Sequence, residues 1–351
     1  MPQRLIIACD GTWNDLCMPA LTNVARLCQS LLPEDKSGYK PIPQVIYYDD
    51  GVGADANGLT RLWKGAVGQG LDRLVYEAYR FICLNYNPGD ELFPLGFSRG
   101  AYTARSVAGL IGRVGLVPRR HIAAIPSAME LYRQRRKVLQ PSGELRSFQL
   151  TYGCKPAPIT FLGCWDTVGA LGIPNKSELL ALDKISRRRY QFHDTTLGNH
   201  IQRAAHAVAI DERRREFKPT LMQLGPNMKA SQLREVWFPG DHGCVGGGDL
   251  QKQPLANVAL RWLVESAAEM GAPLAVDWSY LDDNAQPDPL AAFSSNVDWL
   301  YSEQARSLTH VPFSALHPSV LQRIRGNPNY RPRNLMRVHG PALNQAANQT
   351  T

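Results

Sequence analysis

The chain of 351 residues carries a net charge of +8, and its 44% hydrophobic and 20% charged residues are the balance of a folded globular protein. No run approaches the roughly 18 consecutive apolar residues that a membrane-spanning helix needs, which excludes an integral membrane protein of the helical class. The apolar stretch before Asp10 is too short for a secretory signal. Cys9, Cys83 and Cys164 lie in apolar segments, which is typical of buried cysteines that stay reduced. We therefore expect a cytoplasmic protein, with export only through a machine that needs no signal peptide.

The positive charge is concentrated in clusters of basic residues, namely Arg119-Arg120, Arg135-Arg136-Lys137, Arg187-Arg188-Arg189 and Arg213-Arg214-Arg215. Such clusters can form solvated helix faces, or they can attract an anionic membrane surface. No helix-turn-helix, zinc-finger or RNA-binding pattern accompanies them, so a nucleic acid is not expected as a partner.

Short apolar runs that end in turn residues predict strands at 4–9, 44–48, 91–97, 159–165 and 234–240. Apolar residues at helical spacing predict a helix over 71–82 and another that follows Ser98 and ends near 112–115. Pro94 is the weak point of the third strand, because proline has no amide hydrogen to donate to a neighbouring strand.

Strands that alternate with helices predict an α/β fold, with a mostly parallel central sheet and helices on both faces. Asp10, Ser98, Asp166 and His242 each follow a predicted strand, and the carboxyl ends of parallel strands share one edge of a sheet. We expect a single domain over residues 1–341, with a helical insertion at about 119–158 that could act as a lid, and a disordered tail over 342–351.

The pentapeptide Gly96-Phe97-Ser98-Arg99-Gly100 fits G-x-S-x-G, in which a serine occupies a tight turn between a strand and a helix. The predicted strand before it and the helix of small residues after it are the context that this motif requires. Ser98 is therefore the candidate nucleophile. The alternative is a serine that only caps the following helix.

A serine nucleophile needs a base within hydrogen-bond reach and an acid that orients the base. His242 is the favoured base because it lies between a strand end and a glycine-rich turn, with His206 and His317 as rivals. Asp166, directly after an apolar strand, is the favoured acid, with Asp211 and Asp241 as alternatives.

The turn Asp10-Gly11-Thr12 resembles the first motif of haloacid-dehalogenase phosphatases, but Ala8 stands where their nucleophilic aspartate would be. In a serine hydrolase, the amide of Gly11 or Thr12 can join that of Arg99 to bind the developing oxyanion. Asp10 then braces the turn, or simply forms an Asx-turn. No spacing indicates a metal site, and no glycine-rich segment matches a nucleotide-binding fingerprint, so no cofactor is expected.

Several stretches together resemble a known family, including CDGTWND, YYDDGVG, GFSRGAYTAR, FLGCWDTVGALG, HAVAIDERRREFKP and VWFPGDHGCVGGG. They are similar to an uncharacterised-domain family of α/β-hydrolases that includes bacterial type VI secretion lipase effectors. The similarity extends from about Asp10 to Leu335. By this resemblance Ser98 would be the nucleophile, Asp166 the acid and His242 the base, and the fold would be that of an α/β-hydrolase.

The resemblance implies the cleavage of acyl esters of phospholipids, of the phospholipase A type. The sequence thus predicts a serine esterase or lipase with an ester or phospholipid substrate and peripheral contact with an anionic membrane. An esterase or thioesterase for small soluble esters is the alternative, as is a binding module without activity on the same fold.

Overall fold

The computed structural model of the chain describes residues 2–11, 14, 16–51, 62–134, 143–169, 196–294, 297, 299 and 301–349. Its centre is a seven-stranded sheet, in the order β2-β3-β1-β4-β5-β6-β7 within the described residues. The strands are β1 (Arg4–Cys9), β2 (Glu34–Asp35), β3 (Ile42–Asp49), β4 (Glu91–Phe97), β5 (Leu162–Trp165), β6 (Ala204–Ala209) and β7 (Leu233–Phe238). All neighbours pair in parallel except the short edge strand β2, which is antiparallel to β3.

The helices of the described residues connect and cover these strands. They are α1 (Asn23–Ser30), α2 (Leu62–Asn85), α3 (Arg99–Val114), α4 (Ile125–Arg133), α5 (Gly143–Tyr152), α7 (His242–Gly246), α8 (Gln253–Glu269), α9 (Trp278–Asn284), α10 (Pro318–Gly326) and α11 (Arg333–Asn348). Short 3-10 helices lie at η1 (Arg119–Ala124), η3 (Arg215–Phe217), η4 (Ala230–Gln232) and η5 (Phe313–Ala315).

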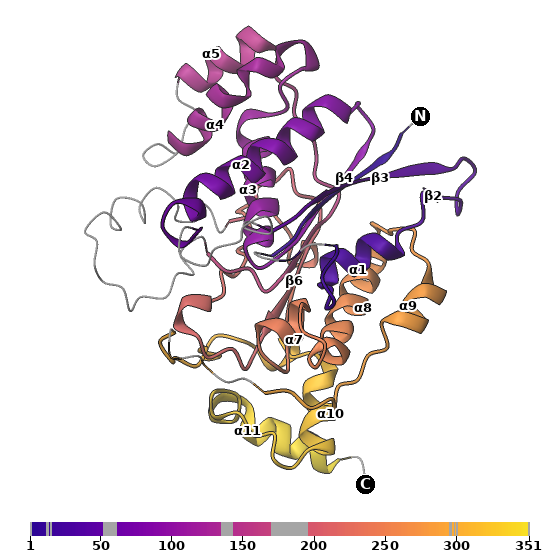
Figure 1. The fold of residues 1–351 in the computed structure, drawn as a ribbon, viewed down its shortest axis with the longest axis vertical. Helices are drawn as coiled ribbons and strands as arrows, with labels where there is room; N and C mark the ends of the chain where they lie inside the picture. The colour runs from indigo at the N-terminus through magenta and orange to yellow at the C-terminus, as the bar shows by residue number, and fades with distance from the viewer. Residues whose placement is uncertain are drawn as a thin grey trace.

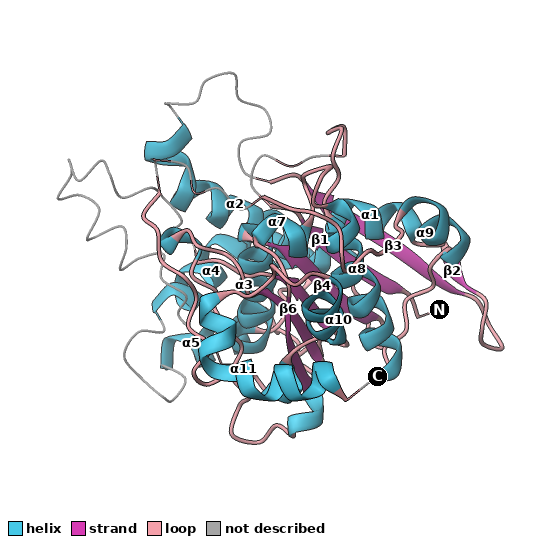
Figure 2. Ribbon diagram, turned by 90° about the horizontal axis from the view of Figure 1, so that it is seen from below, coloured by secondary structure: helices cyan, strands magenta, loops and turns pink. Residues whose placement is uncertain are grey.

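Helices cover both faces of the sheet, with α2 and α3 on one side and α1 and α8 on the other (Figures 1 and 2). The side chains of β1 alternate between the two layers, as the two-residue period of a strand requires. Leu5 and Ile7 belong to the apolar cluster with α2 and α3, whereas Ile6 and Ala8 belong to the cluster with α1 and α8. The predicted α/β fold class, with its mostly parallel sheet and helices on both faces, is confirmed.

The C-terminal helices α10 and α11 form a third apolar cluster against β6 and β7, at the lower end of the molecule in Figure 1. Leu335 and Leu343 of α11 are almost fully buried there. The expectation of a disordered tail from residue 342 therefore needs correction, because α11 continues through Asn348. Few apolar residues mark this segment, but they recur on the face that packs against the sheet.

The insertion at 119–158 contains η1, α4 and α5 in its described parts. It packs on the outside of α2 and α3, and Ile125, Met129 and Leu145 are buried in the same apolar cluster as those helices. Its described helices thus extend one layer of the fold. A lid function of residues 119–158 stays a prediction.

Pro94 lies inside the central strand β4, opposite Ile7 of β1. The backbone groups of Leu92 and Ser98 bond toward the β5 side, and alternation along the strand directs the nitrogen of Pro94 the same way. The pairing of β4 with β5 begins only at Leu95. The amide hydrogen that Pro94 lacks would therefore fall just before the first paired residue of the two strands. Within the described residues, no helix is long and apolar enough to cross a membrane.

Candidate active site

Ser98 occupies the sharp turn between the end of β4 and the start of α3. Its backbone angles are φ 58° and ψ −120°, in the left-handed region that residues with a side chain rarely adopt. Strain of this kind costs on the order of 1–3 kcal/mol and is typical of functional turns. Although Ser98 is the N-cap residue of α3, its hydroxyl makes no capping hydrogen bond. The alternative of a purely structural cap therefore does not account for the serine.

The two glycines of the motif are required by close backbone contacts. A Cβ at Gly96 would lie 2.5 Å from the carbonyl carbon and oxygen of Gly100. A Cβ at Gly100 would overlap the carbonyl oxygens of Cys9 and Asp10 at the end of β1. Neither position tolerates a side chain, so the glycines allow α3 to start directly against the sheet.

The structure brings Ser98, His242 and Asp166 together from three different strand ends. Nε2 of His242 lies 2.8 Å from Oγ of Ser98, and Nδ1 of the same ring lies 2.5 Å from Oδ2 of Asp166. All three residues are buried, with exposed fractions of 6%, 7% and 0% for Ser98, His242 and Asp166. His242 is the first residue of α7, directly after the turn that follows β7.

Asp166 is held by the backbone and by a guanidinium. Its Oδ1 accepts from the amide of Ala209 at 2.9 Å and from Nη1 of Arg306 at 2.6 Å, and its Oδ2 accepts from Nη2 of Arg306 at 2.8 Å. Burial opposes ionisation of this carboxyl, but the charge of Arg306 and the hydrogen bond with His242 outweigh it. The pKa of Asp166 therefore lies well below its ordinary value.

Aromatic rings enclose the imidazole of His242. Phe97 lies 4.6 Å away between ring centroids, and Phe217 meets the ring edge-on at 4.9 Å. The guanidinium of Arg214 covers Phe217 at 3.6 Å and forms a two-bond ion pair with the buried Glu212. Burial raises the pKa of Glu212, but the hydrogen bonds and charge of Arg214 prevail and lower it to about 2.

The two other candidate histidines, His206 and His317, have partners away from Ser98. His206 lies within β6, where its ring bonds with Glu235 at 2.9 Å and accepts from the amide of Thr167 at 3.1 Å. His317 caps α10 and stacks on Phe238 at 4.4 Å, and burial lowers its pKa to about 4. Within the described residues, neither ring bonds to Ser98 or Asp166.

The alternative acids also have other partners. Asp211 accepts from the amide of Gly240 at 2.6 Å and from the hydroxyl of Tyr330 at 2.7 Å, and burial raises its pKa to about 7. Asp241 caps α7 and pairs with Lys252 at 2.8 Å. Of the three candidate carboxylates, the one that contacts the His242 ring is Asp166.

Asp10 braces the turn after β1. It accepts from the hydroxyls of Thr22 and Tyr48 and from the amide of Gly11, each at 2.6 Å, and burial raises its pKa to about 6. The amide of Gly11, a candidate oxyanion donor, is thus engaged by Asp10. Thr12, the other candidate in this turn, lies outside the described residues. The amide of Arg99 belongs to the first turn of α3, directly after Ser98.

Sequence reasoning missed Arg306, Glu212 and Phe217. Glu212 stands in the segment AIDERRREF, where the basic residues and Asp211 are the more prominent features. Nothing in the sequence around Arg306 indicates that it belongs to the site, because its contact is with Asp166, a residue far along the chain. The basic clusters 135–137 and 187–189 lie outside the described residues, whereas Arg213 and Arg214 form ion pairs with Glu303 and Glu212.

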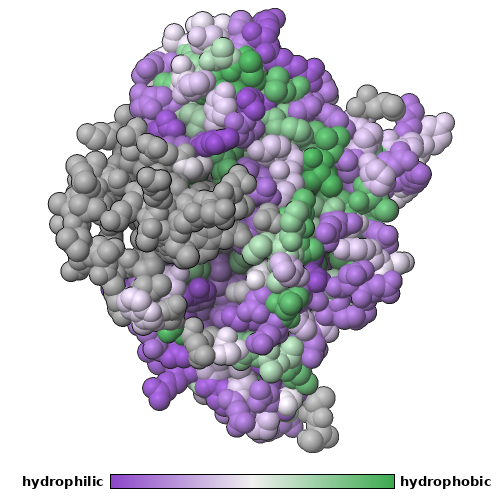
Figure 3. Space-filling view, in the orientation of Figure 1, coloured by the Kyte–Doolittle hydropathy of each residue, from purple (hydrophilic) through white to green (hydrophobic). Residues whose placement is uncertain are grey.

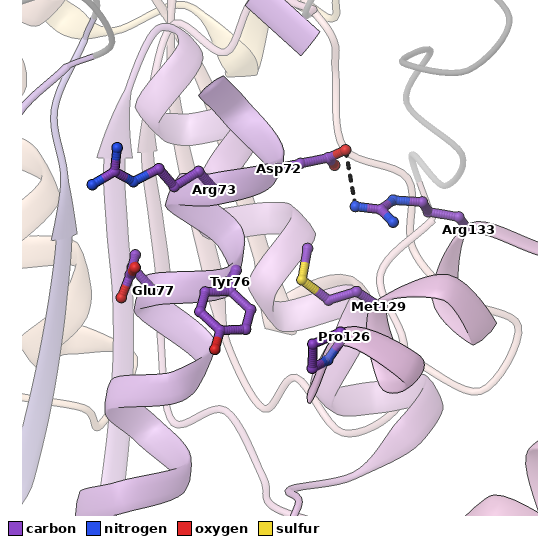
Figure 4. Close-up of a pocket in the computed structure, with 7 residues that line it drawn as sticks. All are labelled: Asp72, Arg73, Tyr76, Glu77, Pro126, Met129 and Arg133. Carbon is purple, nitrogen blue, oxygen red and sulfur yellow. Dashed lines mark ion pairs between the residues drawn. The ribbon is translucent and has the colours of Figure 1, made fainter. Parts of the chain in front are cut away.

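A separate cavity of about 450 Å³ lies between α2 and α4 (Figure 4). Tyr76 and Met129 line it, and an ion pair of 2.9 Å joins Asp72 to Arg133 at its side. It contains none of the residues around Ser98, so it does not define the candidate site. The described residues also contain no cluster of histidine, cysteine and acidic side chains arranged to hold a metal ion.

Comparison with known proteins agrees with this architecture. The family described as the catalytic domain of Tle1-like phospholipase effectors of the type VI secretion system matches residues 3–266. An uncharacterized protein of Saccharomyces cerevisiae, YEL023C, is 29% identical over 240 residues, which are 62% of this chain and 32% of the yeast protein.

Two solved structures are also similar. The crystal structure of an uncharacterized protein from Pseudomonas aeruginosa has a TM-score of 0.50 and 18% identity, over 83% of this chain and 50% of that one, a likeness of fold. The structure of the Tle1 effector bound to the VgrG spike gives a TM-score of 0.38 and 16% identity, over 73% and 53% of the two chains. This chain spans about a third of the yeast relative and half of each solved structure. Because the family match covers most of the sequence, the chain belongs to the family of Tle1-like phospholipase effector catalytic domains.

Proposed function

We propose that this protein is a serine hydrolase that cleaves carboxylic esters of phospholipids. The observation that carries the proposal is the continuous hydrogen-bonded chain from Ser98 through His242 to Asp166, with distances of 2.8 and 2.5 Å. A hydroxyl, an imidazole and a carboxylate in this order form a nucleophile, a general base and an orienting acid.

In the proposed reaction, Oγ of Ser98 attacks the ester carbonyl while Nε2 of His242 takes its proton. The carboxylate of Asp166 fixes the ring through Nδ1 and stabilises the imidazolium that forms. His242 then gives the proton to the leaving alcohol, which leaves the acyl group on Oγ of Ser98. Water attacks this acyl-enzyme while His242 takes its proton, and His242 returns the proton to Oγ as the bond to the acyl group breaks and the fatty acid is released.

The oxyanion that forms on the carbonyl needs backbone donors close to Ser98. We assign the amide of Arg99 to this role, since it lies in the first turn of α3, where the helix dipole favours negative charge. Thr12 is the proposed second donor. The amide of Gly11 can contribute only when it is released from Asp10, to which it donates at 2.6 Å.

A phospholipid substrate is supported by family membership, by the net charge of +8 and by apolar side chains beside the site. The loops that follow β1 and α7 pack together, since the amide of Gly248 donates to the carbonyl of Leu21 at 3.2 Å. Leu16 and Leu250 on these loops are exposed. On the face drawn in Figure 3, small groups of hydrophobic residues lie among hydrophilic ones. Such a surface suits peripheral contact with an anionic membrane.

The test combines two substrates and one probe. Purified protein and its Ser98→Ala variant are incubated with anionic phospholipid vesicles, with chromogenic esters of rising chain length, and with a fluorophosphonate probe. We expect release of fatty acid from vesicles, lost by at least about 10⁴-fold in the variant, and labelling that maps to Ser98.

Two other outcomes would each indicate a different function. Hydrolysis confined to short soluble esters would identify an esterase and end the phospholipase proposal. A wild-type protein that neither hydrolyses esters nor reacts with the probe would be a binding module on this fold.

A further inference from the structure

Arg306 reaches the candidate site from the loop before α10, beyond the residues that the family match covers. It is 6% exposed, and it forms the two-bond ion pair with Asp166 described above. The same guanidinium donates to the carbonyl of Ala209 at 2.8 Å and to that of Phe217 at 2.7 Å. It therefore joins the carboxylate to the end of β6 and to the segment whose ring covers His242.

The geometry of this pair fixes the plane of the carboxylate. A guanidinium presents a rigid fork of donors, so two parallel bonds prevent the carboxylate from rotating. With Oδ1 held by Ala209 and Arg306, Oδ2 is left directed at Nδ1 of His242. A lysine in place of Arg306 would supply the charge without this constraint.

Arg306 is itself held in place by the C-terminal part of the fold. The side-chain amide of Asn334, in α11, donates to the carbonyl of Arg306 at 3.1 Å and to that of Ile210 at 3.0 Å. Helix α11, which also carries residues of the third apolar cluster, thereby supports the site through the side chain of Asn334.

The charges around His242 form two compensated pairs. Asp166, at Nδ1, is neutralised by Arg306, and Glu212, which accepts from the backbone amide of His242 at 3.2 Å, is neutralised by Arg214. Besides these groups, the ring meets Ser98 and the aromatic rings of Phe97 and Phe217. Removal of Arg306 would leave two carboxylates with one guanidinium, an excess of negative charge that favours the protonated imidazolium.

We propose that Arg306 is a positioning residue for the proposed hydrolase: it orients Asp166 toward His242 and offsets the charge of that carboxylate beside the imidazole that accepts the Ser98 proton. The inference rests on the proposed function, since it assigns a further residue to the same site. Arg306 contacts neither substrate nor nucleophile and acts through Asp166.

The test measures the second-order rate of Ser98 labelling by a fluorophosphonate between pH 5 and 10, for wild type, Arg306→Ala, Arg306→Lys and Arg323→Ala. Arg323 is the matched control, because it is also a buried arginine that donates to backbone carbonyls, those of Pro289 and Ala291, away from Ser98. Rates are expressed per folded molecule from circular dichroism.

In Arg306→Ala we expect the maximal rate to fall by roughly 10–100-fold, the loss typical when a side chain that orients a metal-ligating group is removed. The acid limb of the profile should move to higher pH by about one unit, and added methylguanidinium should restore both. Arg306→Lys should retain the wild-type midpoint at a lower rate, and Arg323→Ala should retain both. If Arg306→Ala does not fold, Arg306→Gln removes the charge with a smaller loss of volume and carries the same expectation.

An acid limb that stays at the wild-type pH in Arg306→Ala or Arg306→Gln overturns the inference, as does an equal shift in Arg323→Ala. NMR titration of the His242 ring measures the same midpoint without turnover. A wild-type protein that is not labelled would overturn the proposed function, whereas labelling with an unmoved His242 titration in the variant would overturn the positioning by Arg306 alone.

Discussion

The ring of Phe97 lies against the imidazole of His242, with 4.6 Å between the ring centroids, and the same ring packs against Gly246, one turn further along α7. A Cβ at Gly246 would overlap three atoms of that ring. Phe97, the residue before Ser98, therefore contacts both the imidazole of His242 and the backbone of α7 at Gly246. A change in the packing at Gly246 would alter the surroundings of the imidazole.

We expect Gly246→Ala to displace Phe97 from its position against His242. The variant should lose about 1–3 kcal/mol of unfolding free energy, as overpacked cores do, and its ester turnover per folded molecule should fall. Gly243→Ala in the same helix is the control, since its Cβ would meet the flexible side chain of Lys252 at 3.2 Å and Oδ1 of Asp241 at 3.7 Å, neither of which is an overlap. Equal turnover in the two variants would show that the Phe97 contact does not affect the reaction.

His242→Ala should lower kcat/KM for ester hydrolysis by at least about 10⁴-fold, because no other ring in the described residues bonds to Ser98. His317→Ala should retain turnover while lowering the melting temperature, because His317 stacks on Phe238. Steady-state kinetics on folded protein decides between them. The reverse pattern would reassign the general base.

Glu212 should stabilise the fold above its ordinary pKa and lose that effect as the pH falls. The depressed pKa, about 2 against 4.5, corresponds to on the order of 3 kcal/mol, present above about pH 4.5 and lost as the pH falls toward 2. Urea denaturation should therefore find Glu212→Gln much less stable than wild type at pH 7, with a much smaller difference at pH 2.5.

Glu303→Gln is the control, because the ion pair of Glu303 with Arg213 is half exposed and should contribute less than about 1 kcal/mol. A difference between Glu212→Gln and wild type that does not change with pH would show that the carboxylate is not ionised at the site.

Asp211 should have the opposite effect. Its pKa is raised from 3.8 to about 7 by burial, so the folded state binds the additional proton, and wild-type stability should fall as the pH rises from about 4 through 7. Both donors, Gly240 and Tyr330, bond to the same oxygen, Oδ2, which the carbonyl of an asparagine can replace. Asp211→Asn should gain stability relative to wild type across this window, and a gap between the two that stays constant from pH 4.5 to 8 would contradict the assignment.

The apolar patterns predicted the strands that carry the candidate site because these strands are short, buried and bounded by turns. Strands β1 and β4 have the limits that the sequence indicated, and the sheet is parallel as the alternation implied. Strand β6 was missed, since AAHAVA consists mostly of alanine, whose small side chain marks neither a strand nor a core. Its burial depends on the strands beside it.

Ser98, Asp166 and His242 could be predicted as candidate site residues because each follows a strand. Residues that follow parallel strands lie along the same edge of the sheet, and these three side chains meet there. Arg306 could not be predicted in this way, because no local pattern precedes it and its partner is 140 residues away. The engagement of Gly11 by Asp10 also depends on Tyr48 and Thr22, which the chain brings together only in the folded state.

The position of Arg306 in the chain relates the site to protein synthesis. A polypeptide still on the ribosome can have passed Ser98, Asp166 and His242 and yet lack the guanidinium that Asp166 pairs with at 2.6 Å. A carboxylate buried without its cation costs about 3–5 kcal/mol, so the unfinished chain would leave Asp166 in water. On the proposed mechanism the serine would thus become reactive only near the completion of translation, and a fragment released before residue 306 would carry the three side chains without the cation that pairs with Asp166.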